Sequence, residues 1–412
     1  MESETIKVYG YRWVILAAFM LAVVANQMMW ITFAPVTITA SAFYHVSDLS
    51  IGLLSMVFMV VYIFISMPAS WVIDSWGFRA SVMTGALLTG GFGLLRGLLA
   101  KSFTWVLVSQ IGIAIGQPFI LNAITMVAAR WFPLKERGTA AGLGSLAMYL
   151  GIILGMVVTP VLVAGSGMEW MLLYYGILAM LAAVVFIVLA REHPPTPASP
   201  PGHEERSGIL EGLRVILKKK NYLILMLIFF IGLGIFNAVA TWIEDIVRPR
   251  GFTPAQAGMA GGLMILGGLV GAVIMSWLSD HYRRRIPFIL IALGAAAVGL
   301  AGLTFSTGYL MLLISSFVIG FFLLSAGPVG FQYGAEIAYP APEGTSNGIL
   351  LLMGQISGIL FIIGMDTFKV PGTGSMTPSL LVLVALMIVS LLLATRLKES
   401  QLLSGNREKE IS

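Results

Sequence analysis

Twelve long apolar segments recur along the chain, and they limit what it can fold into. A helix needs roughly 20 mostly apolar residues to cross about 30 Å of hydrocarbon. Lipid offers no partner for backbone N–H and C=O groups, so each segment must bond them internally as a helix. The segments cover residues 13–41, 50–73, 80–100, 104–129, 139–163, 169–190, 221–246, 256–279, 286–306, 308–338, 344–367 and 377–396. The sequence therefore predicts an all-α membrane protein with 12 transmembrane helices.

The composition supports a membrane protein and excludes several other classes. The 412 residues are 58% hydrophobic and only 10% charged, whereas about 25% of the residues of a soluble domain are charged. The chain has no cysteine, and its four histidines are scattered, so we expect neither a metal site nor a cofactor. We expect membrane lipids as partners and no nucleic acid, because the basic residues follow membrane topology.

The distribution of lysine and arginine predicts the orientation. If the N-terminus is cytoplasmic, the segments on that side hold 19 of these residues and the outer loops hold four. Cytoplasmic loops of membrane proteins carry the excess of positive charge. We therefore expect a multi-pass protein of the cell membrane with both termini in the cytoplasm.

The longest polar interruption divides the chain into two halves of similar size. Residues 191–208 are rich in proline, which favours an extended linker. Within 207–220, apolar residues share one helical face beside basic residues, a pattern typical of a helix on an anionic membrane surface. The predicted domains are a six-helix bundle at 1–190, a cytoplasmic linker with a surface amphipathic helix at 191–220, a second bundle at 221–396 and a cytoplasmic tail at 397–412.

An internal repeat relates the two halves. Residues 70–74 (Ser-Trp-Val-Ile-Asp) correspond to 276–280 (Ser-Trp-Leu-Ser-Asp), and 138–142 correspond to 344–348, both at an offset of 206. The matched segments hold equivalent positions relative to the predicted spans. Two parallel six-helix halves of this kind are the arrangement of the major facilitator fold, so we expect two pseudo-symmetric bundles.

The turns after the second and eighth spans carry charged residues at matching positions. Residues 70–79 and 276–285 resemble the major facilitator superfamily signature, with Ser70 and Ser276 at the position of its first glycine and with Ser75 and His281 in place of its first basic residue. A carboxylate at a helix end can pair with a neighbouring basic residue in one state and release it in another. The alternative is that these charges only mark the membrane edge. The candidate gating residues are Asp74, Arg79, Arg130, Arg137, Asp280, Arg283, Arg284, Glu336 and Glu343.

A narrower resemblance lies in residues 26–30 (Asn-Gln-Met-Met-Trp), 328–340 and 343–346 (Glu-Gly-Thr-Ser). These segments resemble the feline leukaemia virus subgroup C receptor family of haem and choline transporters. The resemblance implies a choline pocket that includes Trp30, Gln117 and Gln355. The family's tyrosine in span seven corresponds to Asn237, which follows Phe236, so one aromatic wall of the implied pocket is missing unless Phe236 or Tyr149 supplies it.

Polar residues recur at helical spacing along several spans and form stripes. The residues implied by the resemblance lie on these stripes. Amides in hydrocarbon cost several kcal/mol unless they are paired, so these stripes should face protein or water. We expect them to line a central cavity, and the alternative is that they join helices within a half. The candidate substrate-binding residues are Asn26, Trp30, Gln117, Tyr149, Phe236, Asn237 and Gln355.

Arg96 is the one deep charge, and no Asp, Glu or His lies at the middle of a predicted span. We expect Arg96 to extend toward the outer interface, as long basic side chains do. Proton-coupled carriers usually hold an intramembrane carboxylate or histidine, so the pattern favours transport without proton coupling.

These features together predict a monomeric alternating-access transporter of a small organic solute that works by facilitated diffusion. A choline-like cation is the expected substrate if the family pocket is retained. The alternatives are a monocarboxylate-type carrier of organic anions, with Arg96 as anchor, and a membrane sensor that binds solute without moving it. We do not expect an enzyme, because the sequence shows no nucleophile–base pair or phosphate-binding loop.

Overall fold

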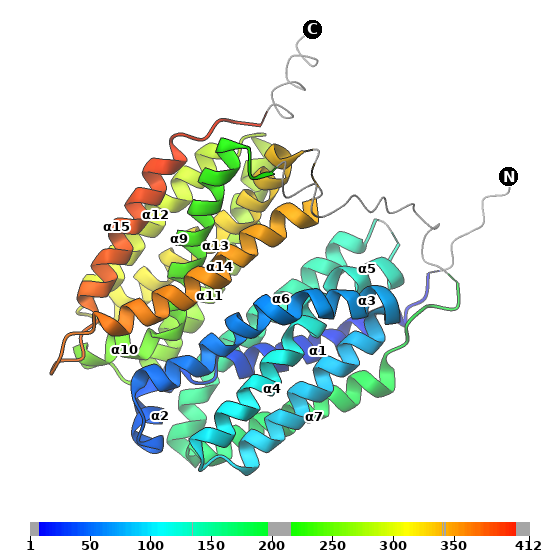
Figure 1. The fold of residues 1–412 in the computed structure, drawn as a ribbon, viewed down its shortest axis with the longest axis horizontal. Helices are drawn as coiled ribbons and strands as arrows, with labels where there is room; N and C mark the ends of the chain where they lie inside the picture. The colour runs from blue at the N-terminus through cyan, green and yellow to red at the C-terminus, as the bar shows by residue number, and fades with distance from the viewer. Residues whose placement is uncertain (1–7, 134, 197–215, 340, 342, 401–412) are drawn as a thin grey trace, which may run out of the picture. The chain divides into compact units, whose positions relative to one another are not determined.

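The fold is a helical membrane protein in two parts (Figure 1). The computed structural model describes residues 8–133, 135–196, 216–339, 341 and 343–400, with the side chains of 343 and 344 left out. The chain divides into two compact units, Met1–Glu204 and Glu205–Ser412. The amphipathic segment predicted within 207–220 lies mostly outside the described residues, and so does the tail from 401 onward.

Each unit is built only from helices in its described part. The first contains α1 (Arg12–Ile31), η1 (Ala34–Val36), α2 (Thr37–Tyr44), α3 (Asp48–Leu98), α4 (Phe103–Leu121), α5 (Ile124–Trp131), α6 (Arg137–Ser166) and α7 (Met168–Leu189). The second contains α9 (Lys220–Thr241), α10 (Ile243–Val247), η2 (Arg248–Arg250), α11 (Pro254–His281), α12 (Ile286–Phe305), α13 (Tyr309–Ala338), α14 (Glu343–Thr367) and α15 (Thr377–Ala394).

The prediction of twelve spans is confirmed. Eleven helices in the described part of the chain are long and apolar enough to cross a membrane. One of them, α3, has 51 residues, which is roughly 75 Å of helix and more than two bilayer cores. It is interrupted at Gly77, whose φ of 87° and ψ of 169° are not helical. Because a side chain would be strained at that φ, Gly77 allows the chain to turn between the second and third spans.

Three predicted spans are broken where the sequence pattern suggested continuous helices. Segment 13–41 is interrupted after α1, segment 104–129 between α4 and α5, and segment 221–246 between α9 and α10. In the first case Pro35 has no N–H to donate to the carbonyl of Ile31, so the α-helical ladder stops there. Such breaks expose backbone carbonyls, which must then be satisfied by side chains.

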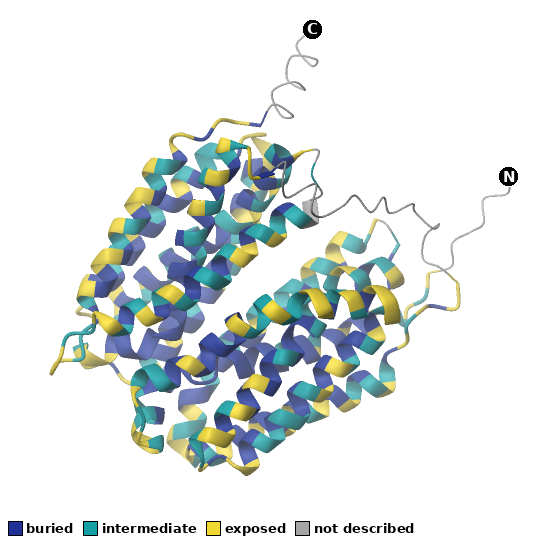
Figure 2. Ribbon diagram, viewed as in Figure 1, coloured by how far each residue is buried: buried dark blue, intermediate teal, exposed yellow. Residues whose placement is uncertain are grey.

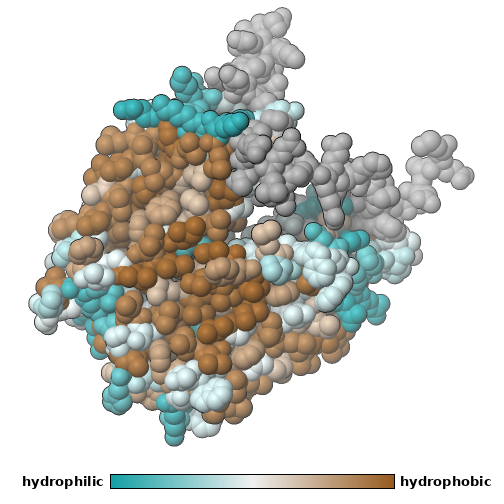
Figure 3. Space-filling view, in the orientation of Figure 1, coloured by the Kyte–Doolittle hydropathy of each residue, from teal (hydrophilic) through white to brown (hydrophobic). Residues whose placement is uncertain are grey.

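The outer faces of the helices suit lipid. Figure 2 shows buried residues inside each half and exposed residues on the outer helix faces. Large apolar side chains such as Phe64, Met67, Val188 and Leu310 are exposed. In the view of Figure 3, hydrophobic residues cover the flanks of the helices and hydrophilic residues gather near the helix ends.

Candidate functional site

Trp30 lies in the last turn of α1, directly before the break in that span. Its side chain is 9% exposed. The indole N–H is buried and has no hydrogen-bond partner in the described part of the chain. A buried donor without a partner costs free energy that a polar ligand group could recover. Trp30 is therefore the candidate in the first half with the clearest capacity to bind a ligand.

The other candidates of the first half differ in what their polar atoms contact. The amide of Asn26 is fully buried and donates to the hydroxyl of Thr89 at 3.0 Å and to the carbonyl of Ile113 at 3.5 Å. It therefore joins α1 to α3 and α4. Gln117 is buried in α4, and Tyr149 is half-buried in α6. Neither of these two side chains forms a hydrogen bond within the described residues.

The second half brings its candidates together on two packed helices. Asn237 of α9 donates its amide N–H to the carbonyl of Gly354 in α14 at 3.2 Å. Gln355 follows Gly354 directly and is half-buried, while Phe236 beside Asn237 is buried. The Oδ1 atom of Asn237 accepts no hydrogen bond from the described residues. The contact between α9 and α14 therefore leaves one amide oxygen able to accept a bond from a ligand.

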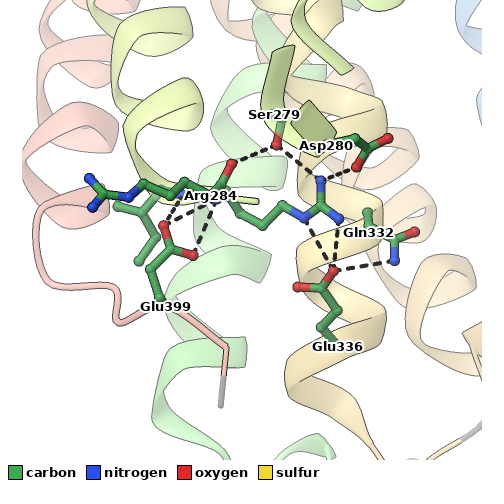
Figure 4. Close-up of polar contacts among 8 residues, drawn as sticks. Ser279, Asp280, Arg284, Gln332, Glu336 and Glu399 are labelled. Atoms are coloured by element: carbon green, nitrogen blue, oxygen red, sulfur yellow. Dashed lines mark hydrogen bonds and ion pairs between the residues drawn. The ribbon is translucent and has the colours of Figure 1, made fainter. Parts of the chain in front are cut away.

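Arg285 joins the carboxylates of Asp280 and Glu336 at one end of the second half, and Figure 4 labels both carboxylates with the neighbouring Ser279 and Gln332. Its guanidinium donates to Asp280, to the hydroxyl of Ser279 at 3.1 Å, and to Glu336 at 3.0 and 3.2 Å. Gln332 also donates to Glu336, at 3.3 Å. Burial lowers the pKa of Arg285, but the two carboxylates outweigh that effect and the net pKa is raised. The guanidinium therefore remains charged.

The structure thus places Arg285, rather than a neighbouring arginine, at the centre of this network. The sequence pattern predicted this role for Arg283 and Arg284, both of which are exposed. The repeat contains the missing signal, because Arg79 advanced by 206 positions is Arg285. Glu343 begins α14, but its side chain lies outside the described part of the structure.

The corresponding turn of the first half has no such network. Asp74, Arg79 and Arg130 are exposed, and their side chains form no ion pair within the described residues. Arg137 instead donates to the carbonyls of Ala129 and Phe132, at 3.0 and 3.3 Å. The physical reason lies in the repeat: Glu336 corresponds to Arg130. The first half thus has an arginine at the position of the carboxylate that pairs with Arg285 in the second half.

Two glutamates outside the predicted gating set cap equivalent helix starts. Glu192 accepts hydrogen bonds from the backbone N–H of Phe78 at 3.2 Å and of Arg79 at 2.7 Å. Glu399 accepts bonds from the backbone N–H of Arg285 and of Ile286, both at 3.1 Å. Glu192, Phe78 and Arg79 lie 207 positions before Glu399, Arg285 and Ile286, respectively. The signal available in the sequence was one glutamate shortly after the last span of each half.

Arg96 does not extend to the membrane interface, so that prediction is wrong. Its side chain is fully buried. The guanidinium lies beside α1 and α4, where it donates to Gln110 at 2.7 Å. Acceptors inside the first half bind its two terminal nitrogens, and hydropathy alone could not reveal them.

Comparison with known proteins identifies the family. The model of the Major Facilitator Superfamily matches residues 15–362. The chain belongs to that superfamily. A bacterial homolog of the human lysosomal transporter Spinster, solved in an inward-facing and unoccupied conformation, has the same fold, with a TM-score of 0.76. That likeness covers 94% of this chain and 97% of the other at 18% identity.

Two groups of relatives within the superfamily are similar over most of the chain. Solute carrier family 49 member A3 of Danio rerio is 31% identical over 379 residues, which are 88% of this chain and 80% of the relative. The human choline/ethanolamine transporter FLVCR2 is 28% identical over 384 residues, which are 88% of this chain and 73% of the relative. These relatives are named as solute carriers and transporters, so the chain is a membrane transporter and not an enzyme.

Proposed function

We propose that this transporter carries a small organic cation of the amino-alcohol class, such as choline or ethanolamine, by alternating access and without proton coupling. The relatives named choline/ethanolamine transporters support this substrate class. We further propose that both termini are cytoplasmic, as the bias of lysine and arginine indicates.

The observation that carries the proposal is the buried indole of Trp30 with its unpartnered N–H group. An aromatic face attracts an ammonium group by about 2 kcal/mol or more when the site is desolvated. The buried indole N–H lacks a partner within the described residues, so it can also donate to the hydroxyl of an amino alcohol. One side chain thus offers a surface for each end of the substrate.

The contacts of Arg96 argue against the organic-anion alternative. An anchor for a carboxylate needs guanidinium N–H groups that face the ligand. The two terminal nitrogens of Arg96 instead donate to Gln110, to the carbonyl of Met29 and to the hydroxyl of Thr32. The sensor alternative does not explain why the two halves repeat their charged turns.

Uptake by proteoliposomes tests the proposal. Labelled choline and ethanolamine should enter vesicles that contain the wild-type protein, and labelled lactate should not. Trp30→Ala should raise the KM for the cation by about tenfold or more, because it removes the aromatic face. Trp30→Phe should retain part of the affinity.

Trp170→Ala is the matched control, because Trp170 is an exposed tryptophan of α7 and its loss should leave uptake unchanged. Normal cation uptake by a folded Trp30→Ala variant would show that Trp30 is not a contact. Uptake of lactate alone would reject the substrate class.

A further inference from the structure

Arg96 is a fully buried charge, and no carboxylate pairs with it in the described part of the chain. Its terminal nitrogens donate to Gln110 at 2.7 Å, to the carbonyl of Met29 at 3.4 Å and to the hydroxyl of Thr32 at 3.5 Å. Its guanidinium carbon lies 5.7 Å from the centre of the Phe33 ring. A buried charge is costly unless it is compensated, so these neutral groups must supply the compensation.

The compensating groups surround the C-terminal end of α1. The last carbonyls of a helix have no partner within the helix and carry partial negative charge. The carbonyl of Met29 receives Arg96, the amide of Gln110 at 3.2 Å and the hydroxyl of Thr32 at 3.2 Å. Gln110 also donates to the carbonyl of Leu54 in α3 at 3.2 Å. Arg96 and Gln110 therefore hold the broken end of α1 against α3 and α4.

The bonded carbonyl belongs to the peptide group that joins Met29 to Trp30. A peptide group is planar, so fixing the carbonyl of Met29 also fixes the N–H and the Cα atom of Trp30, to which its side chain is attached. The same contacts thus orient an indole whose own N–H has no partner among the described residues.

We infer that Arg96 and Gln110 are positioning residues that fix the Met29–Trp30 peptide group and thereby aim the Trp30 ring at the substrate. This inference rests on the function proposed for Trp30. Arg96 does not touch the substrate; it acts through the backbone of α1.

The arrangement is specific to the first half. The positions 206 residues after Arg96 and Gln110 are Gly302 and Ser316, which cannot supply the same pair of donors. In the second half, the indole N–H of Trp242 donates to the carbonyl of Ile362 at 3.0 Å beside the break between α9 and α10. The two halves therefore support their broken spans with different groups: Arg96 and Gln110 in the first, and the Trp242 indole in the second.

The first experiment measures uptake of choline and ethanolamine. Arg96→Met and Gln110→Leu should each raise the KM by about tenfold, because each removes a charge-assisted bond or its partner, while Vmax changes less. Arg96→Lys should recover part of the loss. The double variant should be no worse than the more severe single variant, because both residues act on one peptide group.

Two further variants separate positioning from general damage. In a Trp30→Ala background, Arg96→Met should cause no further rise in KM. Arg250→Met is the matched control, because Arg250 is another partly buried arginine that donates to carbonyl groups, those of Leu303 and Ser306. It should lower the melting temperature without raising the KM. Equal, additive losses in both backgrounds would overturn the inference, and so would a lactate uptake that depends on Arg96.

The second experiment does not depend on the substrate. The chain has no cysteine, so Trp30→Cys provides a single thiol whose modification rate reports the accessibility of that position. We expect Arg96→Met and Gln110→Leu to raise the rate by about tenfold, since opening a packed position by about 1.4 kcal/mol corresponds to that factor, and Arg250→Met to leave it unchanged. An unchanged rate in all variants would reject the positioning role even if choline proves to be the substrate. A raised rate without any choline or ethanolamine uptake would keep the positioning role and reject the proposed substrate.

Discussion

Two buried arginines show how much the neighbours of a residue decide its role. Arg285 pairs with Asp280 and Glu336, so it joins charged helix ends. Arg96 meets only neutral groups among the described residues and supports the end of α1. Both side chains are long and always charged, and neither role follows from the residue type alone.

At the same scale, Asn237 should decide which ammonium is preferred. A primary ammonium needs hydrogen-bond acceptors, whereas a quaternary ammonium needs aromatic faces. The amide N–H of Asn237 is bonded to Gly354, which leaves its oxygen as an acceptor. We expect Asn237→Tyr to lower the KM for choline relative to ethanolamine by about tenfold, in keeping with the size of a cation–π contact.

Asn237→Leu is the control for this exchange, because it removes the acceptor without adding an aromatic face. It should weaken ethanolamine uptake and leave choline no better than in the wild type. The comparison uses competitive uptake of the two labelled substrates. A Tyr variant that keeps the wild-type ratio of KM values would show that Asn237 does not contact the ammonium group.

At the scale of elements, Glu192 and Glu399 should stabilise their halves by similar amounts. Each caps the start of a span with bonds to two backbone N–H groups. Loss of a helix cap costs about 0.5–2 kcal/mol, so Glu192→Ala and Glu399→Ala should both lower the melting temperature in detergent. His193→Ala and Lys398→Ala, which alter exposed neighbours, should not. Identical melting of all four variants would mean that the caps contribute nothing.

Replacing the two carboxylates that pair with Arg285 should lower the melting temperature by unequal amounts. The side chain of Glu336 is 9% exposed and that of Asp280 is 66% exposed. Breaking a buried pair costs about 3–5 kcal/mol, whereas an exposed pair contributes about 0–1 kcal/mol. Glu336→Gln should therefore lower the melting temperature far more than Asp280→Asn. The reverse order would show that Asp280 is the main partner of Arg285.

At the scale of the whole molecule, the charges of the spans predict how transport is driven. Glu244 and Asp245 are buried, but they pair with Arg248 and Lys369 at 3.2 and 2.7 Å. In the described part of the chain, no carboxylate or histidine lies at the middle of a span. Transport of a cation should then follow the membrane potential, which contributes about 2.3 kcal/mol per charge at 100 mV.

This prediction is tested in vesicles with an imposed potassium diffusion potential. An inside-negative potential should accelerate uptake of choline or ethanolamine, while a pH gradient at clamped potential should have little effect. Strong acceleration by the pH gradient alone would show that a proton is carried with the substrate.

The sequence by itself determined the number of spans, because hydrocarbon accepts only long apolar helices with internally bonded backbones. It also determined the twofold repeat, since the offset of 206 places similar residues at equivalent turns. The break after α1 was missed, although Pro35 marked it, because hydropathy continues across the break.

Only the tertiary structure decided which polar groups meet. The partners of Arg96, Arg285, Glu192 and Glu399 lie up to 114 residues away along the chain, and helix packing alone brings them within hydrogen-bonding distance. Likewise, only the packed structure shows that the indole N–H of Trp30 has no partner among the described residues. Whether a buried donor is satisfied depends on every neighbouring element, and a sequence pattern describes one element at a time.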